Sequence, residues 1–127
     1  MSEEIFEKGM AVRRAVLGAE YVARAEAGKT DFDADFQRYV TEHAWGAVWT
    51  RPGLEKRIRS MLTIAMLASL GRFEELGAHI CATRNTGVTR EEVKEILLQV
   101  AVYAGAPAAN AAFAVAKKIY QEMDEKR

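Results

Sequence analysis

The residues with the clearest chemical potential in this sequence are a histidine and a group of arginines. His79 lies in AHICATRN, residues 78–85, a stretch of mixed apolar character. An imidazole has an ordinary pKa of about 6.5, so His79 is the natural proton donor if a reaction takes place here. A single histidine on such a helix is more often structural than catalytic, and that alternative stays open. His43 lies in a polar segment, where we expect it to be solvated.

The run AWGAVWTRPGLEKRIRS, residues 44–60, joins two tryptophans to a Pro-Gly turn and a cluster of basic side chains. Cations at the start of a helix oppose the helix dipole, which favours acidic residues there. Arginines in this unfavourable place indicate an anionic partner, since the planar guanidinium can bind both oxygens of a carboxylate. The pattern favours a small dicarboxylate over a polyanion, with a solvated helix start as the alternative. The arginines around the two central helices are Arg51, Arg57, Arg59, Arg72 and Arg84.

The two tryptophans and the cysteine have simpler interpretations. Trp45 and Trp49 are one helical turn apart, and we expect at least one of them in the core. The alternative is that they form the wall of a pocket for a planar ligand. Cys81 follows His79 by two residues, a spacing that points the side chains to different faces of a helix. We therefore expect a buried, inert thiol rather than a Cys–His nucleophile.

Composition narrows the class of protein. The 127 residues predict one domain over 1–127, and a domain of this size often buries further surface in an oligomer. Eighteen basic and eighteen acidic residues cancel, so we do not expect a nucleic-acid partner. No Cys/His spacing predicts a metal site. The start lacks a signal-peptide pattern, and the longest apolar run, 61–70, is too short for a bilayer. With one cysteine, these features indicate a cytoplasmic protein.

Helical periodicity and chain breakers predict an all-α fold of seven helices with short connections. Glycines end several of the helices, and Thr89 with Glu92 predicts a capping box. The helix at 54–70 is apolar all round after its first turn, which predicts burial in the core or in a subunit interface. One helix is expected to begin at Thr30 or Asp31 and to carry Phe32, Phe36, Tyr39 and Val40 on one face. The predicted ranges are roughly 3–17, 19–27, 30–45, 54–70, 72–85, 89–104 and from about 106 to 123.

Four blocks of the sequence resemble the 4-carboxymuconolactone decarboxylases. They are GMAVRRAVLG, AWGAVWTRPGLEKRIRSMLTIAMLASLGRFEEL, AHICATRNTGVT and VAVYAGAPAANAAFAVAK, and together they cover most of the chain. The resemblance implies an all-α fold of the alkylhydroperoxidase D-like type, usually assembled as a homohexamer. It also implies decarboxylation of 4-carboxymuconolactone, a small dicarboxylate lactone, to β-ketoadipate enol-lactone and carbon dioxide in protocatechuate catabolism.

The implied reaction has defined chemical needs. Loss of carbon dioxide leaves electrons that delocalise onto the lactone carbonyl, so the substrate is its own electron sink and no cofactor is required. The enzyme must stabilise the carbonyl oxygen, hold the surviving carboxylate and deliver a proton to carbon. We assign His79 as the general acid, while Arg57 and Arg59, with Ser60, hold the carboxylate or polarise the carbonyl. Further candidates for substrate contacts are Arg51, Arg84 and Asn110, with Trp45 and Tyr103 on the apolar side of the pocket.

The sequence also departs from the family pattern, and alternatives follow from this. Family members often carry an arginine where Cys81 stands, so one carboxylate contact is missing and a paralogue acting on another lactone or carboxylated substrate remains open. A peroxidase of the alkylhydroperoxidase D class would need two cysteines, but Arg72 and Glu75 occupy those positions when His79 is aligned. A dithiol peroxidase cannot cycle without them. A non-catalytic helical interaction protein is the third alternative.

Overall fold

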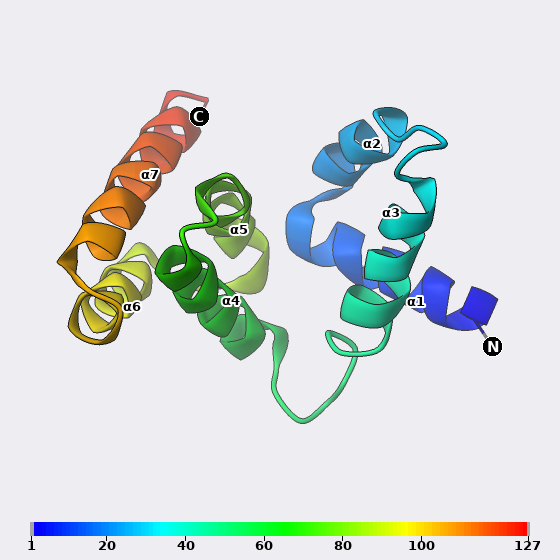
Figure 1. The fold of residues 1–127 in the computed structure, drawn as a ribbon, viewed down its shortest axis with the longest axis horizontal. Helices are drawn as coiled ribbons and strands as arrows, with labels where there is room; N and C mark the ends of the chain where they lie inside the picture. The colour runs from blue at the N-terminus through cyan, green and yellow to red at the C-terminus, as the bar shows by residue number, and fades with distance from the viewer. Residues whose placement is uncertain (1, 127) are drawn as a thin grey trace. The chain divides into compact units, whose positions relative to one another are not determined.

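The computed structural model describes residues 2–126, and over that range the chain is helical with no strand, which confirms the predicted all-α class. The chain divides after Lys56 into two compact units, called the first and the second unit below. No helix of the described range has the length and apolar character needed to cross a bilayer. The elements of Figure 1 are α1 (Ser2–Leu17), α2 (Ala19–Ala27), α3 (Ala34–Val40), the π-helix η1 (Thr41–Gly46), α4 (Lys56–Leu70), α5 (Phe73–Thr86), α6 (Arg90–Tyr103) and α7 (Ala106–Glu125).

The helix ends of the second unit follow from local chemistry that the sequence predicted. Gly87 ends α5 in the left-handed conformation, with φ 86°, and its N–H donates to the carbonyl oxygen of Thr83 at 2.8 Å. Thr89 Oγ1 accepts from the backbone N–H of Glu92 at 3.0 Å, and a Glu92 oxygen accepts from the Thr89 N–H at 2.9 Å. The predicted capping box is therefore confirmed, and it fixes the start of α6.

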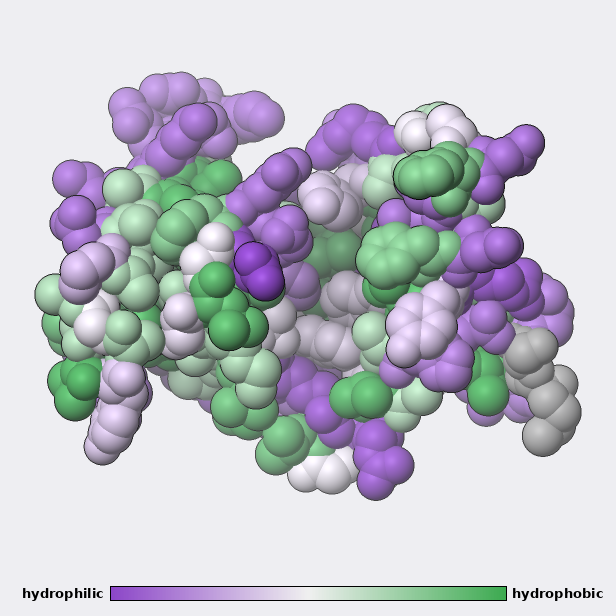
Figure 2. Space-filling view, in the orientation of Figure 1, coloured by the Kyte–Doolittle hydropathy of each residue, from purple (hydrophilic) through white to green (hydrophobic). Residues whose placement is uncertain are grey.

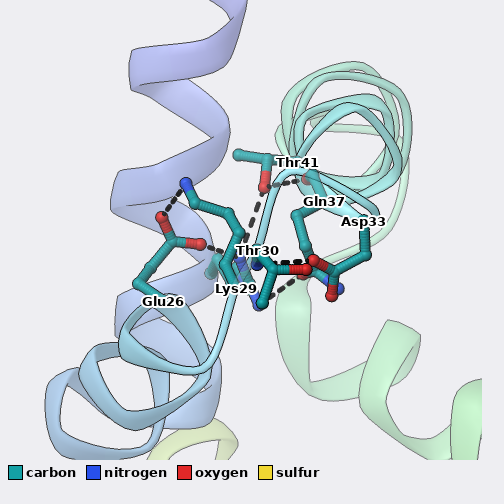
Figure 3. Close-up of polar contacts among 7 residues, drawn as sticks. Glu26, Lys29, Thr30, Asp33, Gln37 and Thr41 are labelled. Atoms are coloured by element: carbon teal, nitrogen blue, oxygen red, sulfur yellow. Dashed lines mark hydrogen bonds and ion pairs between the residues drawn. The ribbon is translucent and has the colours of Figure 1, made fainter.

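The predicted start of the third helix was wrong. The N-cap of α3 is Asp33, not Thr30 or Asp31, because the preceding residues form a hydrogen-bonded turn. Asp33 Oδ1 accepts from the Thr30 N–H at 2.8 Å, and the Asp33 N–H donates to the Thr30 carbonyl at 3.2 Å. Figure 3 shows these residues beside α3. Local side-chain bonds of this kind compete with the helical ladder, so the helix begins only after them.

The third predicted helix also changes its winding. At Thr41 it becomes the π-helix η1, which carries His43 and Trp45. The predicted face of Phe32, Phe36 and Tyr39 does not cover a core within the described chain, since these side chains are 98%, 60% and 58% exposed. His43 is exposed, as predicted, and its ring lies 4.5 Å from that of Tyr39.

In the first unit, two glycines allow α1 and η1 to approach closely. A Cβ on Gly9 would lie 2.2 Å from the carbonyl oxygen of Thr41, and a Cβ on Gly46 would lie 2.5 Å from that of Ile5. Both distances are far below van der Waals contact, so this packing requires glycine at both positions. The close contact places the π-helix, and with it Trp45, against α1.

A buried arginine lies between the helices of the first unit. Arg13 is 6% exposed, although its sequence context gave no reason to expect it inside. Its guanidinium contacts Glu26 Oε2 at 3.3 Å, Thr41 Oγ1 at 3.4 Å and Gln37 Oε1 at 3.4 Å. The last three residues, with Lys29 next to Glu26, are drawn in Figure 3. Arg13 thus connects α1 to the end of α2, to α3 and to η1.

The second unit is built on an apolar core between α4, α5, α6 and α7. One face of α4 lies in this core, while the opposite face is exposed in the single chain, where Figure 2 draws apolar residues in green. The prediction of burial is thus confirmed for one face of α4 only. Its core side chains include Ile64 and Ala68, both fully buried, and its exposed face carries Leu62, Met66 and Leu70 at 43%, 58% and 66% exposure.

Candidate functional site

The arginine-rich start of α4 meets the start of α6. Arg57 is the second residue of α4, and its Nη2 forms an ion pair with Oε2 of Glu92. The Arg57 and Glu92 side chains are 36% and 29% exposed, so the pair lies at the edge of the unit. The first turn of α4 contains no acidic residue. Glu92 therefore supplies, from another helix, a negative charge that this helix start lacks.

Ser60 contacts the same part of the second unit. Its side chain is fully buried, and Ser60 Oγ accepts a hydrogen bond from Thr86 Oγ1 at 3.0 Å. Thr86 is the last residue of α5, and Glu92 lies at the start of α6. Arg57 and Ser60 were expected to share a face of α4, and their partners both belong to the connection 86–92. We call this connection the α5–α6 corner.

His79 lies on α5, between the core and the surface. Burial lowers its pKa from the ordinary value to about 4, and the carboxylate of Glu75, one turn earlier, acts weakly in the opposite direction. The imidazole is therefore neutral at pH 7 in the ligand-free protein. The sequence-based assignment used an ordinary pKa, which the structure corrects. As a general acid, His79 would first have to take up a proton, and a bound dianion would favour that uptake.

The remaining candidates of the second unit are spread over four helices. Arg59 is half-buried on α4. Arg84, in the last turn of α5, and Asn110, on α7, are exposed, and Tyr103 at the end of α6 is 81% exposed. The structure brings Arg57 and Ser60 to the α5–α6 corner. Among the interactions of residues 2–126 described above, none joins Arg84, Tyr103 or Asn110 to it.

The tryptophans and Arg51 belong to the first unit. Trp45 and Trp49 are 5% and 8% exposed, and their rings stack with centroids 4.9 Å apart. The expectation that at least one lies in the core is confirmed, and both do. Arg51 is exposed in the turn that follows.

Cys81 and the acidic residues are the other groups that could react or bind a metal ion. Cys81 is a free thiol and is half-buried rather than buried as predicted. Its position on α5 exposes part of the side chain beyond the apolar core. Among residues 2–126, no group of three or more His, Cys, Asp or Glu side chains is arranged to hold a metal ion.

The sequence did not reveal Thr86 as the partner of Ser60, or Glu92 as the partner of Arg57. Glu92 was recognised from the T-x-x-E pattern as half of a capping box, but that local pattern says nothing about Arg57. The partner of Thr86 lies 26 residues away in the chain. Contacts between helices of this kind leave no spacing signal, so only the fold reveals them.

These features define an all-α protein that places a cationic helix start and a half-buried histidine in one unit. A family model described as the carboxymuconolactone decarboxylase family matches residues 34–118. The match covers more than half of the chain and crosses the division at Lys56. The chain therefore belongs to the carboxymuconolactone decarboxylase family.

Two curated relatives are similar over nearly the whole chain, and a third is similar over a part of it. A 4-carboxymuconolactone decarboxylase of Acinetobacter baylyi is 44% identical over 121 residues, which cover 95% of this chain and 90% of the relative. The nitrosuccinic acid decarboxylase npaB of Metarhizium robertsii is 40% identical over 126 residues, 99% of this chain and 88% of the relative. A 4-carboxymuconolactone decarboxylase of Pseudomonas putida is 46% identical over 41 residues, which cover 32% of this chain and 85% of that sequence.

Proposed function

We propose that this protein decarboxylates 4-carboxymuconolactone to β-ketoadipate enol-lactone and carbon dioxide, as a step of protocatechuate catabolism in the cytoplasm. The observation that carries the proposal is the 44% identity to a 4-carboxymuconolactone decarboxylase over 95% of this chain. The arginines at the start of α4 support it, because the substrate carries two carboxylates that guanidinium groups can bind.

The reaction breaks one carbon–carbon bond and forms one carbon–hydrogen bond. As carbon dioxide leaves, its bonding electrons move through the ring double bond onto the lactone carbonyl. Arg57 and Arg59, with Ser60, hold the surviving carboxylate or stabilise the negative carbonyl oxygen. His79 then delivers a proton to carbon. The lactone itself accepts the electrons, so the proposed chemistry uses no cofactor and no metal.

The low pKa of His79 gives substrate binding a second role. In the ligand-free protein the imidazole is neutral at pH 7, since burial opposes its charge. A dianionic lactone beside it would reverse the balance and raise its pKa. The proton that ends on carbon is therefore taken up from solvent when the substrate binds. Because protonation follows substrate binding, His79 stays neutral while the site is empty.

A second candidate function follows from the other relative. The chain is 40% identical over 99% of its length to a nitrosuccinic acid decarboxylase. A nitro group next to the breaking bond can also accept electrons, and the acid has two carboxylates, so the same groups could serve. Cys81, which stands where family members often have an arginine, is a position where the two substrates could be told apart.

The discriminating experiment measures kcat/KM for both acids with one preparation of purified protein. Product is followed by nuclear magnetic resonance, and carbon dioxide is trapped in parallel. We expect the lactone to be preferred by at least about a hundredfold, since specificity for a fitted substrate commonly exceeds that factor. Turnover of nitrosuccinate alone would replace the first candidate with the second. Release of carbon dioxide from neither acid would reject both.

We further propose that residues 1–127 act as one functional domain and that copies of the chain assemble into a homo-oligomer, a hexamer by family resemblance. The family match across both units supports the single domain. The exposed apolar face of α4 supports assembly, because such faces mark interaction surfaces. Light scattering on the eluting protein measures the assembled mass. A Met66→Glu variant, changed at a side chain 58% exposed in the single chain, should elute as smaller species.

A further inference from the structure

The carboxylate of Glu92 serves two partners at once. Oε1 accepts a hydrogen bond from the Thr89 N–H at 2.9 Å, which is one half of the capping box of α6. Oε2 forms the ion pair with Nη2 of Arg57 on α4. The capping bond ties one oxygen to the helix backbone, so the second oxygen has a direction that the backbone sets.

Arg57 lies where a cation is disfavoured unless an anion accompanies it. It is the second residue of α4, next to the positive end of the helix dipole, and the first turn of α4 has no acidic side chain. Glu92 compensates both the guanidinium and the helix end. A capping box alone does not need this charge, because glutamine at the same position can accept the capping bond. The charge of Glu92 therefore matters for Arg57 beyond the cap.

The ion pair does not use up the guanidinium. Arg57 remains 36% exposed, and a guanidinium has five N–H donors, of which the contact with Glu92 engages those on Nη2. The other donors lie in the same rigid plane. Fixing one edge of the group therefore fixes the direction of the rest, which is what a bidentate contact to a carboxylate requires.

We propose that Glu92 is a positioning residue, which holds the Arg57 guanidinium in the orientation that binds the substrate carboxylate. This inference rests on the proposed function, in which Arg57 contacts the substrate. An arginine held in place before binding loses less side-chain freedom when the ligand arrives. A half-exposed ion pair contributes little to folding stability, so the main effect of Glu92 is on the reaction.

The test uses two substitutions in the same capping box. Glu92→Gln keeps an acceptor for the Thr89 N–H but removes the charge that pairs with Arg57. We expect KM for the lactone to rise about tenfold while kcat changes less than about threefold, the pattern of a lost binding contact. The melting temperature should stay within about 2 °C of the wild type.

Thr89→Ala is the matched control. It removes the hydroxyl that caps α6, but its backbone N–H still donates to Glu92. We expect the melting temperature to fall by about 4 °C. We expect kcat/KM to stay within about twofold, because the Glu92–Arg57 pair remains. If Glu92 only stabilised the fold, Glu92→Gln would lower the melting temperature and leave KM unchanged, as is expected for Thr89→Ala.

A double-mutant cycle with Arg57→Ala shows whether Glu92 acts through Arg57. The inference predicts that Glu92→Gln has no further effect on kcat/KM in the Arg57→Ala background. Additive effects would overturn it, as would wild-type kinetics for Glu92→Gln or for Arg57→Ala. If the wild type releases no carbon dioxide from the lactone, the proposed function fails first and the positioning role falls with it. Activity in the wild type with unchanged KM in Glu92→Gln rejects the positioning role alone.

Discussion

The two units of the chain place their arginines in different ways. In the first unit, Arg13 is 6% exposed and lies between helices, with Glu26, Gln37 and Thr41 around its guanidinium. In the second unit, Arg57 is 36% exposed and meets one carboxylate at the edge of an apolar core. The first arrangement encloses the guanidinium in protein groups. The second leaves part of it accessible to a ligand.

The difference separates an arginine that stabilises the fold from an arginine that can bind a ligand. A buried guanidinium with several protein partners joins helices together, and removing such a group is expected to cost folding stability. A half-exposed guanidinium adds little stability and can bind an anion. The close glycine packing of the first unit is likewise structural, whereas the half-buried His79 of the second unit is a candidate for the reaction. Substitutions at Arg13 should therefore act mainly on stability, and substitutions at Arg57 mainly on the reaction.

The largest expected effect on stability is at Gly9. A Cβ there would lie 2.2 Å from the carbonyl oxygen of Thr41, a backbone atom that cannot move aside cheaply. Gly9→Ala should destabilise the first unit by about 3 kcal/mol or more. The control is Gly28→Ala, whose Cβ would meet nothing closer than 3.7 Å. Denaturant unfolding followed by tryptophan fluorescence reports on this unit, because both tryptophans lie in it. Equal stability of the two variants would contradict the account of α1–η1 packing.

The next largest effect is expected in the pH dependence of folding stability, which should come from His79 in the second unit. Burial lowers the pKa of His79 to about 4, so between pH 6.5 and pH 4 the unfolded chain binds a proton that the folded chain does not. Stability from this group is therefore complete above pH 6.5 and is lost as the pH falls towards 4. We expect a loss of about 2 kcal/mol over this window.

Two histidine variants check that assignment. His79→Gln should reduce the loss of stability between pH 6.5 and pH 4, measured by urea unfolding at each pH. His43→Gln, at the exposed histidine of the first unit, should leave it as in the wild type. The assignment to His79 fails if the two variants show the same pH dependence.

A smaller effect is expected at the α5–α6 corner. Thr86→Val removes the donor to Ser60 Oγ, which is fully buried, and should cost about 1 kcal/mol. The double variant Ser60→Ala, Thr86→Val removes both polar groups and should be at least as stable as Thr86→Val alone, because no buried hydroxyl is left without its partner. A double variant that is less stable by the sum of the two single changes would show that the hydrogen bond is not what couples them.

The fold was predictable where the local sequence decides it. The capping box at Thr89 and Glu92 and the glycine at Gly87 act within a few residues, so their patterns correctly predicted the end of α5 and the start of α6. The start of α3 was missed because the turn from Thr30 to Asp33 competes with helix formation through its own hydrogen bonds. Helix propensity and hydrophobic periodicity do not show whether the turn or the helix is more stable at these residues.

The candidate site was predictable only in part. Arg57 and Ser60 could be named from the sequence because family resemblance and the unfavourable charge at a helix start both pointed to this stretch. Their partners Glu92 and Thr86 come from other helices, and their contacts depend on packing. The pKa of His79 also depends on burial, so the sequence could name the residue but not its resting charge.

The most direct test of the central claim compares the wild type with His79→Ala on 4-carboxymuconolactone. Carbon dioxide release is measured at pH 7 by trapping, and circular dichroism confirms that both proteins are folded. We expect the wild type to release one carbon dioxide per lactone consumed and His79→Ala to be slower by about a hundredfold or more. Rates that agree within a few-fold would contradict the role of His79 as the proton donor, and no release by the wild type would contradict the proposed decarboxylation itself.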